Sequence, residues 1–155
     1  MDGIKHLRQE DLPVKHHCHG EQYEYFRRSF VSRGEKMESL VCIYEVPPGK
    51  SPYPYHYHLK DEETFYIVSG QGVLKTPQGE KPVRAGDLLF FPPNEQGAHK
   101  LTNTSDTENL VYIDMDVIHD VDVCIYPDSG KIGVWGKEVN RVYPVDAHVD
   151  YYQGE

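Results

Sequence analysis

The sequence predicts an all-β domain, a sandwich or barrel of antiparallel strands. Apolar residues do not recur at helical spacing, and 13 glycines and 11 prolines interrupt the 155-residue chain too often for long helices. Short runs rich in branched and aromatic residues recur instead, each bounded by Gly, Pro, Asn or Asp. The predicted strands are Leu40–Val46, Thr64–Val68, Gly72–Thr76, Asp87–Phe91, Asn109–Met115 and Val121–Tyr126. Many short strands at regular spacing are typical of a sandwich or barrel.

The chain divides into one barrel and two flanking segments. Its length and its 38% hydrophobic residues are those of a single domain with one core. We expect an N-terminal arm over residues 1–24, the barrel over 25–135 and a C-terminal tail over 136–155. The arm is polar and rich in histidine, so we expect it to be loosely held, and the end of the tail should fray.

Charge and cysteine content exclude several classes of function. The chain has 16 Lys+Arg against 25 Asp+Glu, a net charge of −9, and its basic residues are scattered, so nucleic acid is not an expected partner. No apolar run approaches the ~20 residues of a membrane span, and Met1–Glu10 is too charged for a signal peptide. Cys18, Cys42 and Cys124 form no CxxC pair, which suits a reducing compartment. We therefore expect a cytoplasmic protein with no membrane partner.

Three histidines and a glutamate are the candidate metal ligands. His56 and His58 lie on an extended Pro-Tyr-Pro-Tyr segment, where the period of two points both imidazoles to one face. Glu63 opens the next strand and can face back toward them, and His99 begins a further strand. Three imidazoles and one carboxylate suit Zn, Fe, Mn, Ni or Cu and disfavour Ca or Mg. We expect a divalent transition metal at this site.

Other interpretations of these residues remain open. The histidines could be ordinary strand residues and the glutamate a surface charge. Glu62 competes with Glu63 for the carboxylate position, and Glu63 is preferred because it shares strand parity with Phe65 and Ile67. The His16–His19 cluster on the arm is expected to bind metal only adventitiously. The remaining histidines are interpreted as surface residues: His6, His119 and His148.

In this pattern the sequence resembles the cupin superfamily, whose two motifs both occur in order. The first, G-x5-H-x-H-x3-4-E-x6-G, is matched with one extra residue in the first gap by Gly49, His56, His58, Glu63 and Gly70. The second, G-x5-P-x-G-x2-H-x3-N, is matched by Gly86, Pro92, His99 and Asn103. Its loop is two residues longer than the pattern and has Asn94 where glycine is expected. The resemblance implies a double-stranded β-helix, the antiparallel jelly-roll barrel of cupins, with the four candidate ligands holding a metal.

Strand parity, counted from the ligands, predicts the wall of a largely apolar cup. The predicted wall residues are Tyr44, Phe65, Ile67, Leu101 and Met115, with Asn103 beside Leu101. Tyr44 and Met115 belong to it only if their strands turn the more apolar face inward. No serine, cysteine or lysine is predicted near enough to serve as a nucleophile, so the catalytic residues stay unassigned. Tyr44 is the one nearby acid, and a core tyrosine is its simpler interpretation.

Three functions compete at this stage. The first is a metal-dependent enzyme on a small organic molecule, either an isomerase of a sugar or oxo-acid or an oxygenase. The second is a metal-containing module that binds or senses a small molecule without turnover. The third is a metal-free sugar-nucleotide epimerase of the related barrel type, which needs a His and Tyr acid–base pair and not four converging ligands. Fold and site type alone do not decide among them.

The strand residues that face away from the candidate ligands predict an interface. Tyr55, Tyr57 and Tyr66 should project away from the cup, and Tyr53 should extend the same row. Tyrosine is enriched at interfaces, so we expect an isologous homodimer. The alternative is that the N-terminal strands around residues 28–32 cover this row.

Overall fold

The computed structural model describes residues 3–33 and 37–155, and it confirms the all-β, antiparallel fold. The described strands are β1 (Val14–His19), β2 (Tyr23–Val31), β3 (Ser39–Val46), β4 (Tyr57–His58), β5 (Glu62–Ser69), β6 (Gln71–Thr76), β7 (Gly79–Arg84), β8 (Leu88–Phe91), β9 (Lys100–Asn103), β10 (Leu110–Val117), β11 (Val121–Tyr126), β12 (Lys131–Gly136) and β13 (Asn140–Pro144). Three short 3-10 helices interrupt them: η1 (Gln9–Asp11), η2 (Glu95–Gly97) and η3 (Pro127–Ser129).

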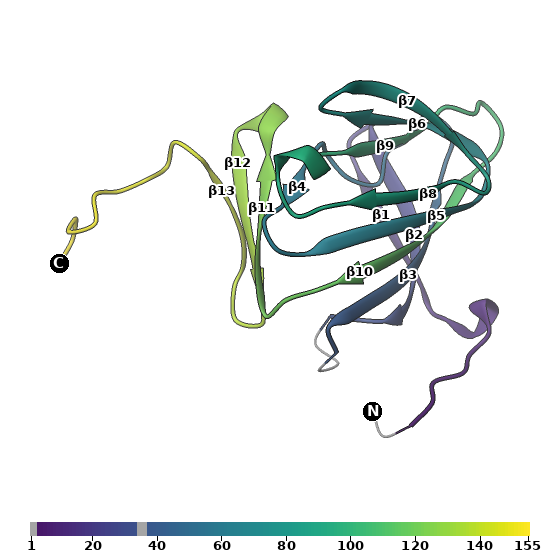
Figure 1. Ribbon diagram of the computed structural model, residues 1–155, viewed down its shortest axis with the longest axis horizontal. Coiled ribbons are helices and arrows are strands. Elements are labelled where there is room, and N and C mark those ends of the chain that lie inside the picture. The colour runs from purple at the N-terminus through teal and green to yellow at the C-terminus, as the bar shows by residue number, and fades with distance from the viewer. Residues whose placement is uncertain (1–2, 34–36) are drawn as a thin grey trace.

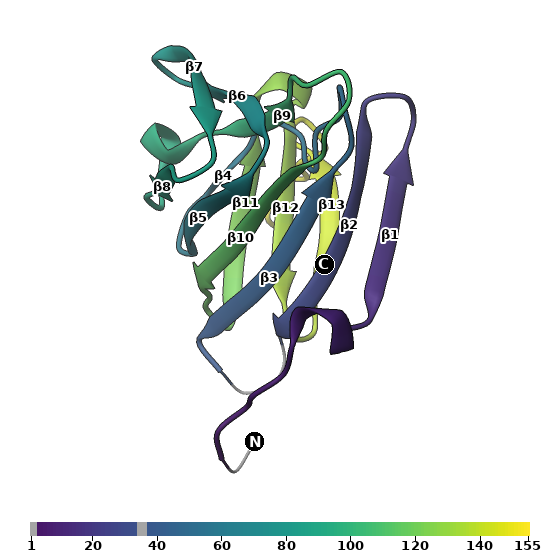
Figure 2. The ribbon, with the colours of Figure 1, turned by 90° about the vertical axis from the view of Figure 1, so that its right-hand side faces the viewer.

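The strands form three sheets that surround one interior (Figure 1). The largest sheet has the order β1-β2-β3-β10-β5-β8, the second has the order β13-β12-β11-β4, and the third has the order β7-β6-β9. Neighbouring strands within all three are antiparallel. Figure 2 shows β1 and β8 at the two ends of the largest sheet. Because consecutive neighbours such as β3 and β10 are distant in sequence, the barrel closes through long-range pairing.

The expected N-terminal arm contains a strand that the sequence analysis did not predict. Residues 14–19 pair with β2 in register, with His16 opposite Phe26 and His17 opposite Tyr25. The His16 and Phe26 rings stack with their centroids 4.4 Å apart. All six residues of β1 are exposed, because the strand lies at the sheet edge and buries neither face. A strand with two exposed faces leaves no apolar alternation in the sequence, which is why it was missed.

The core lies between the sheets. Alternate residues of β3, β5 and β10 face inward, and across these strands Tyr44 is paired with Tyr112 and Tyr112 with Ile67. The Tyr44 and Tyr112 rings stack with their centroids 4.9 Å apart. The most deeply buried apolar side chains include Val46, Ile67, Leu101, Leu110 and Tyr112. This aromatic and aliphatic packing stabilises the barrel through apolar burial.

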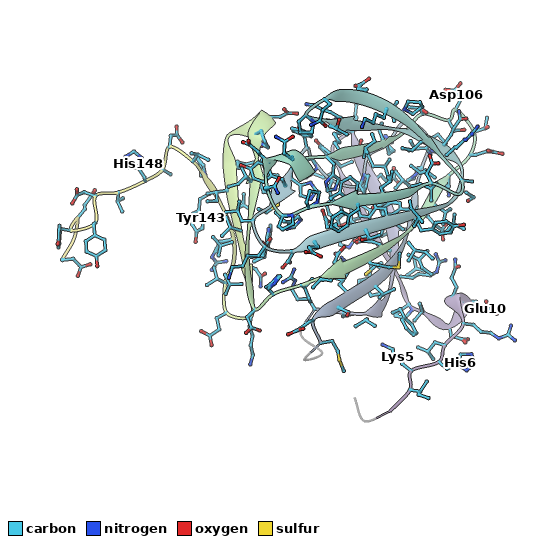
Figure 3. The ribbon with its side chains drawn as sticks, in the orientation of Figure 1. Lys5, His6, Glu10, Asp106, Tyr143 and His148 are labelled. Atoms are coloured by element: carbon cyan, nitrogen blue, oxygen red, sulfur yellow. The ribbon has the colours of Figure 1, made fainter. Side chains whose placement is uncertain are left out.

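Both ends of the chain lie outside the barrel. Figure 3 shows Lys5, His6 and Glu10 beside one end of the molecule, and Tyr143 and His148 on the segment that leads away from it. Part of the expected tail is ordered, because β13 pairs with β12. Beyond it, residues 145–155 extend away from the sheets (Figure 1) and their side chains are exposed. Among the described residues, no helix is long and apolar enough to cross a membrane.

Candidate metal centre

The structure brings the four candidate ligands together at one point. The Nε2 atoms of His56, His58 and His99 lie 3.9, 3.5 and 3.3 Å from Oε2 of Glu63. The imidazoles come from two segments, His56 and His58 from β4 and the residue before it, and His99 from the residue before β9; Glu63 lies on β5. His56 and His99 form a backbone bridge, in which each amide N–H donates to the other residue's carbonyl, at 3.1 and 2.9 Å. This bridge holds two ligands side by side although they are far apart in sequence.

Each imidazole has its other nitrogen engaged by an acceptor. Nδ1 of His56 lies 2.8 Å from the Pro54 carbonyl oxygen, and Nδ1 of His99 lies 2.9 Å from that of Gly97. Nδ1 of His58 lies 2.6 Å from Oδ2 of Asp122. A carbonyl or carboxylate can only accept, so each Nδ1 carries the proton and donates. In the neutral imidazoles, all three Nε2 lone pairs therefore point toward Glu63, which is how ligating histidines are oriented.

The environment of Glu63 suits a bound cation. Its Oε2 is buried and has no hydrogen-bond partner among the residues that the structure describes. Three imidazole nitrogens and one carboxylate oxygen face one another there, and the only proton between them in the metal-free protein is the one that His58 carries, since its pKa is raised to about 11. A divalent transition metal would satisfy all four atoms at once, and a mixed nitrogen and oxygen set fits Zn, Fe, Mn or Ni. Glu62 is the adjacent residue on β5 and belongs to the opposite face of the strand.

Burial and local charge set the protonation of the cluster. Burial lowers the pKa of His56 to about 4, with a contribution from His99. Burial also lowers the pKa of His99. For His58 burial acts in the same direction, but the carboxylates of Asp122 and Glu63 outweigh it and raise the pKa to about 11. For Glu63 burial is likewise outweighed by the surrounding imidazoles, His99 first, and its pKa is lowered, so the carboxylate is ionised.

Asp122 is a functional residue that the sequence analysis missed. Its side chain is fully buried, and besides His58 it accepts hydrogen bonds from the backbone amides of Lys60 and Asp61, at 2.9 and 3.2 Å. One carboxylate thus orients an imidazole and holds the β4–β5 loop. The alternation of β11 places Asp122 and Cys124 on one face, which was readable from the sequence. The contact of this face with His58 could not be read from the sequence, because Asp122 and His58 are 64 positions apart.

The cluster opens into a cavity of about 290 Å³. Its wall is more polar than the sequence predicted, and it is formed by Arg27, Arg33, Leu40, Tyr44, Tyr53, His56, His58, Glu63, Asp114, Asp116, Cys124, Tyr126, Trp135 and Asn140. Of the predicted wall residues, Tyr44 lines this cavity. Phe65, Ile67 and Leu101 are buried in the core behind it. Tyr53 also faces the cavity, and its hydroxyl lies 3.0 Å from those of Tyr44 and Tyr25.

Met115 was placed on the wrong face of its strand. The prediction assumed that β10 turns its more apolar side inward, but Asp114 and Asp116 face the cavity and Met115 is exposed. Asp114 lies opposite Phe65, and Asp116 lies opposite Glu63. Carboxylate oxygens of these two aspartates and Glu63 lie within 4.8 Å of one another. Burial raises the pKa of both aspartates, and for Asp116 the neighbouring Asp114 raises it further.

Comparison with known proteins agrees with this geometry. Residues 42–117 match the family model described as a cupin domain. The chain contains a cupin domain. Over 69 residues this cupin is 34% identical to the oxalate-binding protein of Thermotoga maritima, and over 73 residues it is 30% identical to an uncharacterized protein of Methanocaldococcus jannaschii. These alignments cover 44% and 47% of this chain and 54% of each relative, so the chain spans about half the length of the curated relatives it matches.

Solved structures share most of the fold of this chain. A putative sugar phosphate isomerase from Acidithiobacillus ferrooxidans superposes with a TM-score of 0.78 at 24% identity, over 91% of this chain and 90% of that one. A sugar phosphate isomerase of the cupin superfamily from Silicibacter pomeroyi gives 0.81 at 17% identity, over 92% and 94%. A predicted oxalate decarboxylase from Thermotoga maritima gives 0.65 at 24% identity, over 74% and 100%. At these identities the likeness establishes the fold of this cupin and leaves its reaction open.

The long loop of the second cupin motif still delivers His99 to the cluster. Asn94 begins η2, and its side-chain Oδ1 accepts a hydrogen bond from the Gln96 amide at 2.8 Å. Gly97 packs so closely on Pro92 that a β-carbon would overlap the Pro92 carbonyl oxygen. The displaced glycine therefore lets the loop fold back on itself, and its own carbonyl accepts from His99. The Phe91 ring then stacks on the imidazole of His99 with centroids 3.6 Å apart.

Proposed function

We propose that this cupin is a metal-dependent enzyme that binds a divalent transition metal through His56, His58, Glu63 and His99 and acts on a small organic molecule in the cavity. The observation that supports it best is the convergence of three Nε2 atoms on a buried Glu63 oxygen without a hydrogen-bond partner among the described residues. A metal bound there would polarise a carbonyl or hydroxyl group of the ligand.

Isomerisation is the reaction that the cavity favours. Such a reaction moves a proton between neighbouring carbons, so it needs a group that can take a proton and return it. Asp114 and Asp116 line the cavity beside the candidate ligands, and burial raises the pKa of both; at about 8, the pKa of Asp114 is the one that suits proton exchange near neutral pH. An oxygenase would depend on iron and on dioxygen instead, and would have no need of this carboxyl pair.

A non-catalytic binding module is the second candidate. It is favoured by the likeness to a curated protein named for oxalate binding. Solvent-exchange and oxygen measurements separate these possibilities. An isomerase should incorporate deuterium from D2O into a sugar or oxo-acid substrate, an oxygenase should consume dioxygen, and a binding module should do neither.

Elemental analysis tests the metal site directly. Protein purified without a chelator or a histidine tag should contain about one metal per chain, and His56→Ala with His58→Ala should lose it. His16→Ala with His17→Ala is the matched control, because these adjacent histidines are exposed on β1 and should leave the metal content unchanged. A parent protein that contains no metal and takes none up on titration would refute the proposal.

We also propose that the protein is a cytoplasmic homodimer. The three cysteines are unpaired, as suits a reducing compartment. The expected tyrosine row does not supply the interface as a whole, because Tyr53 faces the cavity. The outer face of β5, β8 and β10 is the better candidate, since Leu88 and Phe90 are 70% and 60% exposed and lie opposite Tyr66 and Thr64. Met115 continues this apolar face on β10.

A further inference from the structure

Strand β2 carries two consecutive arginines whose side chains lie in opposite environments. Arg28 forms an ion pair with Glu45 of β3, which lies diagonally across from it, opposite Phe26. Arg27 is on the other face of the strand, opposite Tyr44, and lines the same cavity as His56 and Glu63. Both are arginines on the same strand. A carboxylate neutralises Arg28, and none of the described carboxylates pairs with Arg27.

The charge of Arg27 has no carboxylate partner within the part of the chain that the structure describes. No ion pair joins it to an acidic residue there, and its Nε is buried without a hydrogen-bond partner. Its side chain forms a hydrogen bond with Tyr44, and the other polar groups that act on it are Tyr53 and the thiol of Cys42. A guanidinium stays protonated, so the cavity contains a permanent positive charge that is partly withdrawn from water. Such a charge is costly to bury unless an anion pairs with it.

The other charged groups of the cavity are already engaged elsewhere. Arg33 pairs with Asp61 at 2.5 Å. Asp114 and Asp116 gather around Glu63 at the end of the cavity where the candidate ligands lie. Arg27 is therefore the one cationic wall residue, among those described, that has no carboxylate partner and keeps donors for an anionic group beside its hydrogen bond to Tyr44.

We propose that Arg27 is an anion subsite, which holds a carboxylate or phosphate group of the ligand while another oxygen of the same molecule reaches the metal centre. Only the contact of the ligand with the metal centre rests on the proposed function; the contact with Arg27 does not. The planar guanidinium presents parallel N–H donors that match either oxyanion in a bidentate arrangement. A cavity of about 290 Å³ is at the small end for ligand sites, so the ligand is a compact organic anion of a few carbons.

Three probes of similar size and different charge test the subsite. Glycerol is neutral, glycerate carries a carboxylate, and glycerol 3-phosphate carries a phosphate. Isothermal titration of the full chain, with and without added zinc, should give at least a roughly tenfold tighter Kd for one charged probe than for glycerol. Arg27→Gln should remove this preference, and Arg28→Gln, the matched control on the outer face, should keep it. The charged probe that binds more tightly identifies the anion of the ligand.

The outcomes distinguish this proposal from the proposed function. Arg27→Gln should have the metal content of the parent, because Arg27 is not a ligand. If the parent takes up no metal, the proposed function fails, and the preference of the metal-free protein for charged probes still tests Arg27. Should Arg27→Gln not give a cooperative melt, Arg27→Lys decides, since it retains the charge without the fork and should keep only part of the preference. Equal Kd values for all three probes, or an unchanged preference in both Arg27 variants, would overturn the proposal.

Discussion

Oδ2 of Asp122 lies 2.6 Å from Nδ1 of His58, although the two residues are 64 positions apart. The same carboxylate accepts hydrogen bonds from two backbone amides of the β4–β5 loop. It therefore holds both the His58 imidazole and the loop that follows His58 in place. We expect Asp122→Asn to weaken metal binding by about tenfold to a hundredfold, because an amide orients the ring less strongly. Competition with a chromophoric chelator measures this change. Asp128→Asn, at an exposed residue paired with Lys75, is the control and should leave the affinity unchanged.

Metal binding should release a proton. The pKa of His58 is raised to about 11 in the metal-free protein, so at pH 7 this imidazole is protonated and a metal must displace that proton. His56 has its pKa lowered to about 4 and is already neutral. Affinity should therefore rise by up to about tenfold per pH unit between pH 7 and 9. Calorimetry in two buffers of different ionisation enthalpy counts the protons, and a count of zero at pH 7.5 would contradict the assignment.

Loss of one ligand should separate metal binding from folding. His99→Ala should lower metal affinity by at least about tenfold while the protein keeps a cooperative thermal melt, because the buried cluster around Ile67 and Leu110 is independent of the ligands. Chelation of the parent should likewise lower the Tm without abolishing the transition. A parent protein that unfolds on chelation would show instead that the metal is structural.

The second-motif loop should be intolerant of a side chain at Gly97. Gly97→Ala would place a β-carbon against the Pro92 carbonyl, so the backbone must shift, and we expect a loss of about 1–3 kcal/mol in the free energy of unfolding. Metal affinity should fall as well, because the Gly97 carbonyl orients His99. Gly79→Ala is the control for a general effect of replacing glycine on the stability of the protein. Its β-carbon would meet open space, so any loss in the free energy of unfolding would come from backbone conformation alone. Denaturant unfolding and metal titration of both variants measure these effects.

The apolar outer face should determine the oligomeric state. Sedimentation equilibrium of the parent at micromolar concentration should give about twice the monomer mass of 17.9 kDa. Phe90→Asp should shift it to the monomer, because it places a charge in the centre of the exposed patch. Tyr57→Asp, outside this patch, should have the smaller effect. A monomeric parent would refute the dimer.

The all-β fold and the four candidate metal ligands could be predicted from the sequence, because strand alternation and ligand spacing are both local patterns. Alternation at His56 and His58 places both imidazoles on one face, and the parity of Glu63 selects it over Glu62. The faces of β10 were assigned incorrectly because the rule that apolar residues face inward fails where carboxylates line a cavity, as Asp114 and Asp116 do here. Strand β1 and the contact of Asp122 with His58 depend on which segments pair over long distances, and no local pattern in one sequence encodes that choice.

The attachment of the β11–β13 sheet to the barrel suggests how a ligand could enter. Strand β11 is tied to β4 and the loop after it by two residue pairs, by the Leu59 amide on the Val123 carbonyl and by Asp122, whereas β12 and β13 follow outside β11 in the sheet order. The opposite wall is part of the six-stranded sheet, and His56 and His99 are locked by their mutual backbone hydrogen bonds. Local opening has its smallest free energy where few hydrogen bonds must break. We therefore expect the outer strands β12 and β13, which carry Trp135 and Asn140, to show the fastest amide exchange around the cavity, and ligand to slow it.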